Sequence, residues 1–248
     1  MKLMDRPGII DVVNRTESVR ICTEFPLISS HLQLTDPDLS HTIELMSKGR
    51  LIVFEGIDGS GKTTQSKTLF QHLTVLGFDC RWFREPGDSP AGKRIRELAL
   101  SREQLSAEDE LALFVTDRRE NVRLNLRPNL EAGRIVILDR YYFSSTCYQG
   151  ARGLDMDAIL KLHEEFVVIP DLAVYIDVDV VTALERIRNN RSERAVRFEI
   201  EDFLVKVRKN YLQLCDRNLL QKVDGNRDRT TVWEEIRPLC EESLKLLR

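Results

Sequence analysis

Residues 56–63, Gly-Ile-Asp-Gly-Ser-Gly-Lys-Thr, constrain the fold of this 248-residue chain more than any other segment. They follow an apolar run at 51–54 and lead into an amphipathic stretch at 62–76, so we expect a turn between a buried strand and a helix. Glycines allow turn conformations that other residues avoid, and successive N–H groups then converge on one point. The helix adds the positive end of its dipole. The segment therefore predicts a site that binds phosphate groups.

The rest of the chain alternates short apolar strands with amphipathic helices. We expect strands near 51–55, 78–84, 134–139, 172–178 and 219–223. We expect helices near 62–76, 107–131, 155–167, 180–189, 197–214 and 231–247. Pro128 should kink or break the second of these helices. The pattern predicts an α/β fold of the P-loop NTPase class, in which a parallel sheet of about five strands carries helices on both faces as three layers.

Composition and charge exclude several classes of protein. The 37 basic and 40 acidic side chains give a net charge of −3, without the basic excess of a general nucleic-acid-binding protein. No run approaches the roughly 18 apolar residues of a membrane helix, and the acidic N-terminus is unlike a targeting signal. Five dispersed cysteines predict reduced thiols. We expect a cytoplasmic protein with no nucleic-acid partner and no membrane partner.

Residues 1–49 differ from the rest of the chain, because their apolar residues form short groups broken by Pro7, Pro26 and Pro37. We interpret them as a weakly structured N-terminal extension, or as a region upstream of a true start at Met46. A regulatory or partner-binding arm is the alternative. Residues 50–248 then form the nucleotide-binding domain.

The phosphate loop leaves the reaction open. We expect a cradle for the nucleotide formed by Gly56, Ile57, Asp58, Gly59, Ser60, Gly61, Lys62, Thr63 and Thr64. Lys62 would place its charge on the β- and γ-phosphates, and the Thr63 hydroxyl would ligate Mg²⁺. A switch GTPase, a motor-type ATPase and a small-molecule kinase all share such a loop. The sequence contains no N-K-x-D motif of the kind that reads guanine.

A second group of candidates follows the third expected strand, where Asp139 and Arg140 come directly after four apolar residues. Ligands of an open parallel sheet collect at the carboxyl ends of its strands. Asp139 can hold the metal or its water shell, and the planar fork of Arg140 suits a phosphoryl group. A surface salt bridge is the alternative reading of the pair.

Five stretches carry a family resemblance. They read Phe-Glu-Gly-Ile-Asp-Gly-Ser-Gly-Lys-Thr-Thr (54–64), Arg-Glu-Pro-Gly (84–87), Leu-Phe-Val-Thr-Asp-Arg (113–118), Asp-Arg-Tyr-Tyr-Phe-Ser-Ser-Thr-Cys-Tyr-Gln-Gly (139–150) and Arg-Phe-Glu (197–199). In this order and spacing the chain resembles the thymidylate kinase (dTMP kinase) family, bacterial type, from about residue 50 to about residue 215. It departs from the family pattern at Asp88-Ser89 and at Val196, which puts adenine-side and closure details in doubt.

The resemblance implies how the acceptor, dTMP, is bound. It implies contacts from Asp58, Arg84, Phe114, Arg118, Arg140, Ser144, Tyr148 and Gln149. Among these, Arg84 and Arg140 would contact the 5′-phosphate, and Asp58 would lie near the sugar. Phe114 would stack on the thymine ring, and Arg118, four residues later, would hydrogen-bond the base edge.

The remaining members of that set would lie along the base and the sugar. Ser144 is expected near the base, Tyr148 under the sugar where it disfavours a 2′-hydroxyl, and Gln149 toward the base. Periodicity alone favours core packing for Phe114 and an ordinary helix contact for Tyr148.

Arginines cluster between 186 and 197, where a solvated helix face is the plain interpretation. Family members with Gly at the position of Gly59 carry catalytic arginines in a lid, so the resemblance implies a lid near 189–197 that contains Arg191 and Arg194. It further implies an Mg²⁺-dependent enzyme that phosphorylates dTMP to dTDP with ATP. The catalytic set would be Lys62, Asp58, Arg140, Arg191 and Arg194, and the assembly a homodimer. A kinase for another deoxynucleotide and a catalytically weak nucleotide-binding regulator remain alternatives.

Overall fold

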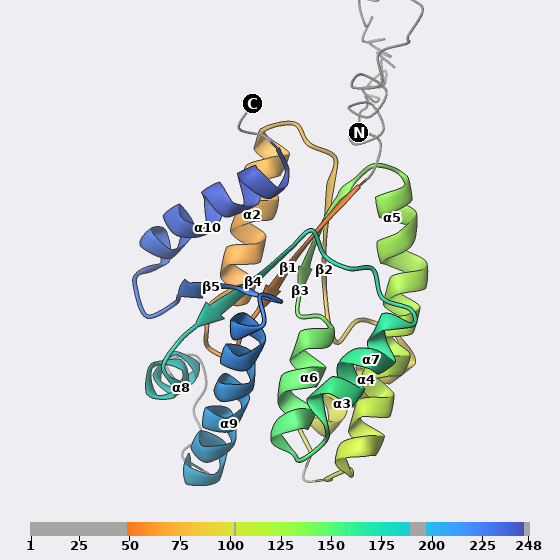
Figure 1. Cartoon of the computed structure of the whole chain (residues 1–248), viewed down its shortest axis with the longest axis vertical. Helices are drawn as coiled ribbons and strands as arrows, with labels where there is room; N and C mark the ends of the chain where they lie inside the picture. The colour runs from red at the N-terminus through yellow and green to blue at the C-terminus, as the bar shows by residue number, and fades with distance from the viewer. Residues whose placement is uncertain (1–48, 102, 189–196, 246–248) are drawn as a thin grey trace, which may run out of the picture.

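The computed structural model describes residues 49–101, 103–188 and 197–245, and five parallel strands form the sheet at its centre (Figure 1). The sheet order is β2-β3-β1-β4-β5. The strands are β1 (Arg50–Glu55), β2 (Cys80–Arg84), β3 (Ile135–Asp139), β4 (Leu172–Asp177) and β5 (Gln221–Asp224). All five predicted strands are confirmed, with β2, β3 and β5 beginning one or two residues later than expected.

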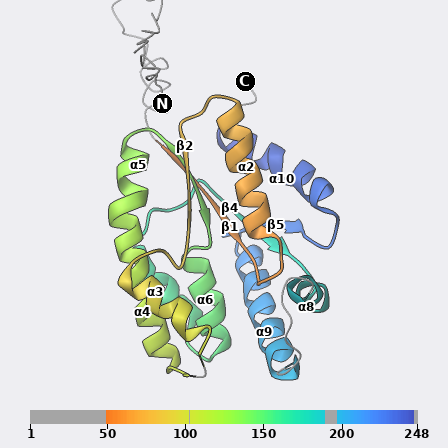
Figure 2. The same ribbon diagram turned by 180° about the vertical axis from the view of Figure 1, so that it is seen from behind.

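Each face of the sheet is covered by helices, which confirms the three-layer prediction. Side chains of β1 alternate between the faces, so Ile52 and Phe54 pack with residues of α2 (Lys62–Val75) and α10 (Arg229–Ser243). Figure 2 shows the ribbons of these two helices next to the sheet. The opposite face is covered by η1 (Val122–Leu126), which continues α4 (Ala107–Asn121), and by the helices α6 (Tyr142–Ala151), α7 (Met156–Glu164), α8 (Val180–Arg188) and α9 (Arg197–Asp216).

Two helices were not among those predicted. The helix α3 (Pro90–Leu98) begins after Ser89, whose hydroxyl accepts a hydrogen bond from the backbone N–H of Gly92. The helix α6 begins within the stretch 139–150 and ends at Ala151, and most of its side chains are buried. Both helices border the cavity described below.

The helix expected over 107–131 is continuous but changes its winding. After α4 the chain makes a π-helical segment, η1 (Val122–Leu126), and then α5 (Arg127–Glu131), which holds Pro128 in its first turn. Within a continuous helix a proline has no backbone N–H to donate, and its ring clashes with the carbonyl group of the preceding turn. The predicted disruption is therefore absorbed as a π turn before Pro128 rather than as a break.

The order of the strands places the functional edge of the sheet. From β1 the chain crosses to β2 on one side, and from β3 it crosses to β4 on the other. The carboxyl ends of the adjacent strands β1 and β3 therefore border the crevice where an α/β sheet binds ligands. The phosphate loop follows β1, and the Asp139-Arg140 pair closes β3.

The described residues include only part of the N-terminal extension, part of the predicted lid and four of the five cysteines. The extension at 1–49 lies outside them except for Gly49, and the proposed lid lies outside them except for Arg197. Cys80, Cys147, Cys215 and Cys240 are free thiols within the described ranges. Among the described residues, no helix combines the length and apolar character needed to cross a bilayer.

Candidate active site

The phosphate loop depends on glycines that adopt positive φ angles. Gly59 has φ +83° and Gly61 has φ +94°, and Gly61 forms the N-terminal boundary of α2. A Cβ atom at Gly59 would collide with the backbone carbonyl oxygen of Ala183 in α8. The loop conformation and its packing against α8 therefore both require glycine at position 59.

Lys62 is buried at the start of α2 and points back over the loop. Its Nζ lies 3.3 Å from the carbonyl oxygen of Ile57 and 3.5 Å from Oδ1 of Asp58. Burial and the nearby charge of Arg140 lower the pKa of Lys62, while Asp58 opposes that shift. A buried ammonium group beside backbone N–H groups is suited to bind an anion.

Thr63 and Asp139 meet where the phosphate loop faces the end of β3. The Thr63 hydroxyl donates to Oδ2 of Asp139 at 2.5 Å. The other carboxylate oxygen of Asp139, Oδ1, is buried and has no hydrogen-bond partner among the described residues. A buried carboxylate oxygen without a donor is costly unless something else compensates its charge. The hydroxyl–carboxylate pair fits Mg²⁺, which binds to hard oxygen ligands and keeps several of its waters.

Arg140 connects the two sides of the crevice. Its φ of +70° turns the backbone directly after β3. Its Nη2 donates to Oδ1 of Asp58 at 2.7 Å, and its Nη1 donates to the Ser144 hydroxyl at 3.0 Å. The guanidinium also lies over the ring of Tyr148, with 5.3 Å between its central carbon and the ring centroid. The charge of Arg140 holds the pKa of Asp58 well below its usual range.

Glu55 holds Ser144 and the backbone that follows Arg140 in place. Its Oε1 accepts from the backbone N–H groups of Tyr141, at 2.8 Å, and Ser144, at 3.2 Å. Its Oε2 accepts from the hydroxyls of Ser144, at 2.6 Å, and Tyr211, at 2.8 Å. Burial raises the pKa of Glu55, and the hydrogen bond from Ser144 and the charge of Arg140 oppose the rise. Sequence reasoning assigned Glu55 no role, although it directly precedes the phosphate loop.

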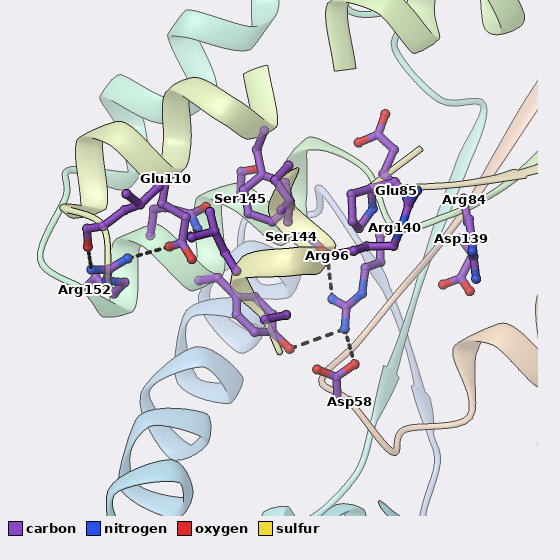
Figure 3. A pocket seen from close by; sticks show the side chains of 18 of the residues that line it. Asp58, Arg84, Glu85, Arg96, Glu110, Asp139, Arg140, Ser144, Ser145 and Arg152 are labelled. Atoms are coloured by element: carbon purple, nitrogen blue, oxygen red, sulfur yellow. Dashed lines mark hydrogen bonds and ion pairs between the residues drawn. The ribbon is translucent and has the colours of Figure 1, made fainter. Parts of the chain in front are cut away.

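A cavity of about 860 Å³ opens between these groups and the helices α3, α4 and α6. Most of the predicted site residues line it: Asp58, Lys62, Thr63, Arg84, Phe114, Asp139, Arg140, Ser144, Tyr148 and Gln149. Figure 3 shows Arg84, Asp139, Arg140 and Asp58 at one end of the cavity and Glu110 and Arg152 toward the other. The side chains of Lys62, Arg84 and Arg140 thus form a positively charged end of the cavity beside the phosphate loop. Phe114 and Gln149 line a different part of the cavity wall.

Among the predicted dTMP contacts, Arg118 is the one that does not line the cavity. Its side chain is 1% exposed and donates from Nε to Oε2 of Glu85 at 2.7 Å. Its Nη1 lies 3.0 Å from the Ser145 hydroxyl and 2.7 Å from Nε2 of His163. Ser145 does line the cavity, so the Arg118 side chain lies behind the cavity wall in this structure, and its predicted contact with the base stays a prediction. The four-residue spacing from Phe114 did not reveal these partners.

The turn at 84–87 is fixed by the same helix α4. The Asp117 carboxylate accepts from the backbone N–H of Gly87 at 2.8 Å and from the Ser89 hydroxyl at 2.5 Å. Arg84, at the end of β2, remains exposed at the cavity. The Asp88-Ser89 departure from the family pattern therefore places a helix cap in contact with α4.

A second hollow, of about 250 Å³, lies on the other side of the phosphate loop. Ser60, Gly61 and Thr64 line it together with Arg186 and the segment that joins β5 to α10. Residues of the phosphate loop thus line two separate hollows. The remaining phosphate-loop positions, Gly56 and Ile57, shape the turn. Arg191 and Arg194 lie outside the described residues, so their predicted role in a lid stays a prediction.

Comparison with known proteins places this arrangement in a family. A family model described as thymidylate kinase matches residues 54–236. The "Probable thymidylate kinase" of Archaeoglobus fulgidus is 41% identical over 196 residues, which cover 79% of this chain and 97% of the relative. The thymidylate kinase of Brachyspira hyodysenteriae is 37% identical over 196 residues, covering 79% of this chain and 95% of the relative.

A solved structure agrees with the sequence relatives. The crystal structure of thymidylate kinase from Ehrlichia chaffeensis aligns with a TM-score of 0.64 at 29% identity, covering 78% of this chain and 99% of that one. The matched segment begins in β1 and extends into α10, so it includes the phosphate loop and the cavity. The chain described here belongs to the thymidylate kinase family.

Proposed function

We propose that this protein transfers the γ-phosphoryl group of ATP to the 5′-phosphate of dTMP, giving dTDP and ADP. The observation that carries the proposal is the cavity that begins at Lys62, Arg84 and Arg140 and extends to Phe114 and Gln149. The cavity thus has a positively charged end and an end lined by an aromatic ring and an amide. A nucleoside monophosphate matches it, with a dianionic phosphate at one end and a planar base at the other. The names of the relatives support thymine as that base.

The donor and acceptor would approach the phosphate loop from its two sides. ATP would occupy the hollow lined by Ser60, Gly61 and Thr64, with its β- and γ-phosphates on the loop and on Lys62. An acceptor phosphate oxygen then forms a bond to the γ-phosphorus as the bond to the bridging β–γ oxygen breaks. Arg84 and Arg140 would hold the acceptor phosphate in line, so that positioning and charge account for the catalysis.

The metal and the carboxylates have separate roles in this proposal. Mg²⁺, when held by Thr63 and Asp139, supplies charge neutralisation to the phosphates of the donor. Asp58 orients Arg140 through their 2.7 Å ion pair and lies where the acceptor sugar would pass. Tyr148, beside Arg140, would exclude a 2′-hydroxyl. Arg191 and Arg194 would supply further positive charge to the transferring group.

The proposal is tested by ADP release with ATP, Mg²⁺ and each of dTMP, dUMP, dCMP and dAMP. We expect the highest kcat/KM with dTMP. Higher efficiency with another acceptor would reassign the substrate, and no turnover with any of the four would overturn the enzyme assignment. Lys62→Ala serves as the control, because loss of the buried ammonium group should abolish transfer while the protein stays folded.

We propose that residues 50–248 contain everything that the reaction requires, since the family match starts at residue 54. Removal of residues 1–45 should leave kcat and KM for dTMP largely unchanged, and an inactive truncated protein would contradict this. The homodimer implied by the resemblance also stays a prediction, which the mass measured by light scattering would test.

A further inference from the structure

Gln149 presents a buried amide at the part of the cavity away from the cation cluster. Its side chain is 2% exposed and lines the cavity. Its Nε2 donates to Oε2 of Glu110 at 2.9 Å. Its Oε1 is buried and has no hydrogen-bond partner among the described residues. A buried amide oxygen left unpaired costs free energy that a ligand can recover.

Glu110 determines which end of that amide remains unpaired. Arg152 donates from Nη1 to the same Oε2 atom at 2.6 Å, so the Glu110 carboxylate is held in an ion pair. An ionised carboxylate accepts hydrogen bonds and donates none. The NH₂ end of Gln149 must therefore face Glu110, and a flipped amide would bring two acceptor oxygens together. The end left without a partner among the described residues is therefore the acceptor oxygen.

An acceptor at this position distinguishes pyrimidines by the proton on N3. Thymine and uracil carry an N3–H donor, whereas N3 of cytosine is itself an acceptor. An oxygen that faces N3 would therefore gain a hydrogen bond with the first two bases and oppose a lone pair on the third. A site built around an unpaired polar group rejects ligands that cannot satisfy it.

We propose that Glu110 is a positioning residue that orients the Gln149 amide oxygen toward the acceptor base and so selects pyrimidines with N3–H over cytosine. The inference rests on the proposed function, because it places the base of a monophosphate at this end of the cavity. Helix α4 supplies Glu110, which Figure 3 shows beside Arg152, and helix α6 supplies Gln149. The selection therefore depends on the packing of these two helices.

The first test is Glu110→Gln, which preserves shape but allows the Gln149 amide to face either way. We expect the ratio of kcat/KM for dTMP to that for dCMP to fall roughly tenfold to a hundredfold, the range of one or two well-formed base contacts. The dUMP-to-dCMP ratio should fall in parallel. The matched control is Arg152→Gln, which keeps the Glu110–Gln149 pair and should lower efficiency with both acceptors while leaving their ratio unchanged.

The second test exchanges the two side chains. Gln149→Glu alone would set two carboxylates against each other and should weaken dTMP binding. In the double variant Glu110→Gln with Gln149→Glu, the amide introduced on α4 can donate to a carboxylate that again presents an acceptor oxygen to the base. The double variant should regain the preference for dTMP over dCMP, an outcome that a purely structural role for Glu110 does not produce.

Binding measurements keep this inference separate from the proposed function. Dissociation constants for dTMP and dCMP, measured by calorimetry without ATP, report the same preference even in a protein that shows no turnover. Equal binding of dTMP and dCMP by the unmodified protein would overturn the inference. An unchanged ratio in Glu110→Gln, or no recovery in the double variant, would also overturn it while leaving the kinase assignment standing.

Discussion

The hydroxyl of Thr63 lies 2.5 Å from Oδ2 of Asp139, although 76 positions separate the two residues in the sequence. The contact joins the first turn of α2 to the last residue of β3. Because Oδ1 of Asp139 has no partner among the described residues, the pair has an oxygen available for a further ligand.

Asp139→Asn should lower kcat about 10²- to 10³-fold, the loss typical when one preorganised charged or polar contact is removed from a transition state. The Mg²⁺ concentration for half-maximal rate should rise, because an amide oxygen binds Mg²⁺ more weakly than a carboxylate. Thr63→Ser, which keeps a hydroxyl, is the matched control and should retain most of the activity. An Asp139→Asn enzyme with unaltered metal dependence would contradict the metal assignment.

Arg140→Lys should lower kcat/KM for dTMP by about 10²-fold. A lysine keeps the charge but cannot bond Asp58 and Ser144 at once, as the arginine fork does at 2.7 and 3.0 Å. Arg81→Lys provides the control, since Arg81 pairs with Asp79 at the surface away from the cavity. Equal kinetics in both variants would show that the fork of Arg140 is dispensable.

Gly59→Ala and Gly77→Ala separate backbone strain from close packing. Both glycines have positive φ angles, +83° and +86°, so each alanine should cost about 1–2 kcal/mol of unfolding free energy. A Cβ at Gly77 meets no atom within 4 Å, whereas one at Gly59 collides with the carbonyl of Ala183. Urea unfolding should therefore show a loss of stability in both variants. ATP titration should show a loss of ATP affinity in Gly59→Ala alone. Similar ATP binding in the two variants would refute the packing argument.

His163→Gln tests the buried network around Arg118 through its pH dependence. Burial, together with the charge of Arg118, lowers the pKa of His163 to about 3. An unfolded histidine gains a proton near pH 6.5 and the folded one does not, so its contribution to stability is present above pH 6.5 and is lost as the pH falls. Between pH 7 and pH 5 the wild-type protein should lose about 2 kcal/mol relative to His163→Gln. Urea unfolding at both pH values measures this, and a constant difference would contradict the shifted pKa.

The residues whose place in the fold was predicted correctly are those fixed by local chain geometry. The phosphate loop needs a strand, closely spaced glycines and a helix in immediate succession, and all three can be recognised in the sequence of residues 51–76. Asp139 and Arg140 were placed at the crevice because a strand ended there. In both cases the position in the fold followed from the nearest element, without knowledge of distant partners.

Arg118 shows why the remainder could not be read from the sequence. Helical spacing places it near Phe114 on α4, but its direction is decided by Glu85 after β2 and by His163 on α7. Helix α3 was missed for another reason: it buries Gly92 and Ile95 and little else, so its apolar pattern is too short to detect. The signal that could have found it is the Ser89-Pro90 pair, a cap followed by a first-turn proline.

One buried carboxylate makes the acceptor side sensitive to distant substitutions. Glu55 accepts from Ser144, which touches Arg140, and from Tyr211 on α9, whose ring stacks on Tyr175 in β4. Variation at Tyr211, which does not line the cavity, would thus be felt by the guanidinium that we propose holds the acceptor phosphate. A substitution on α9 can therefore change the position of Arg140 while every residue that lines the cavity keeps its identity.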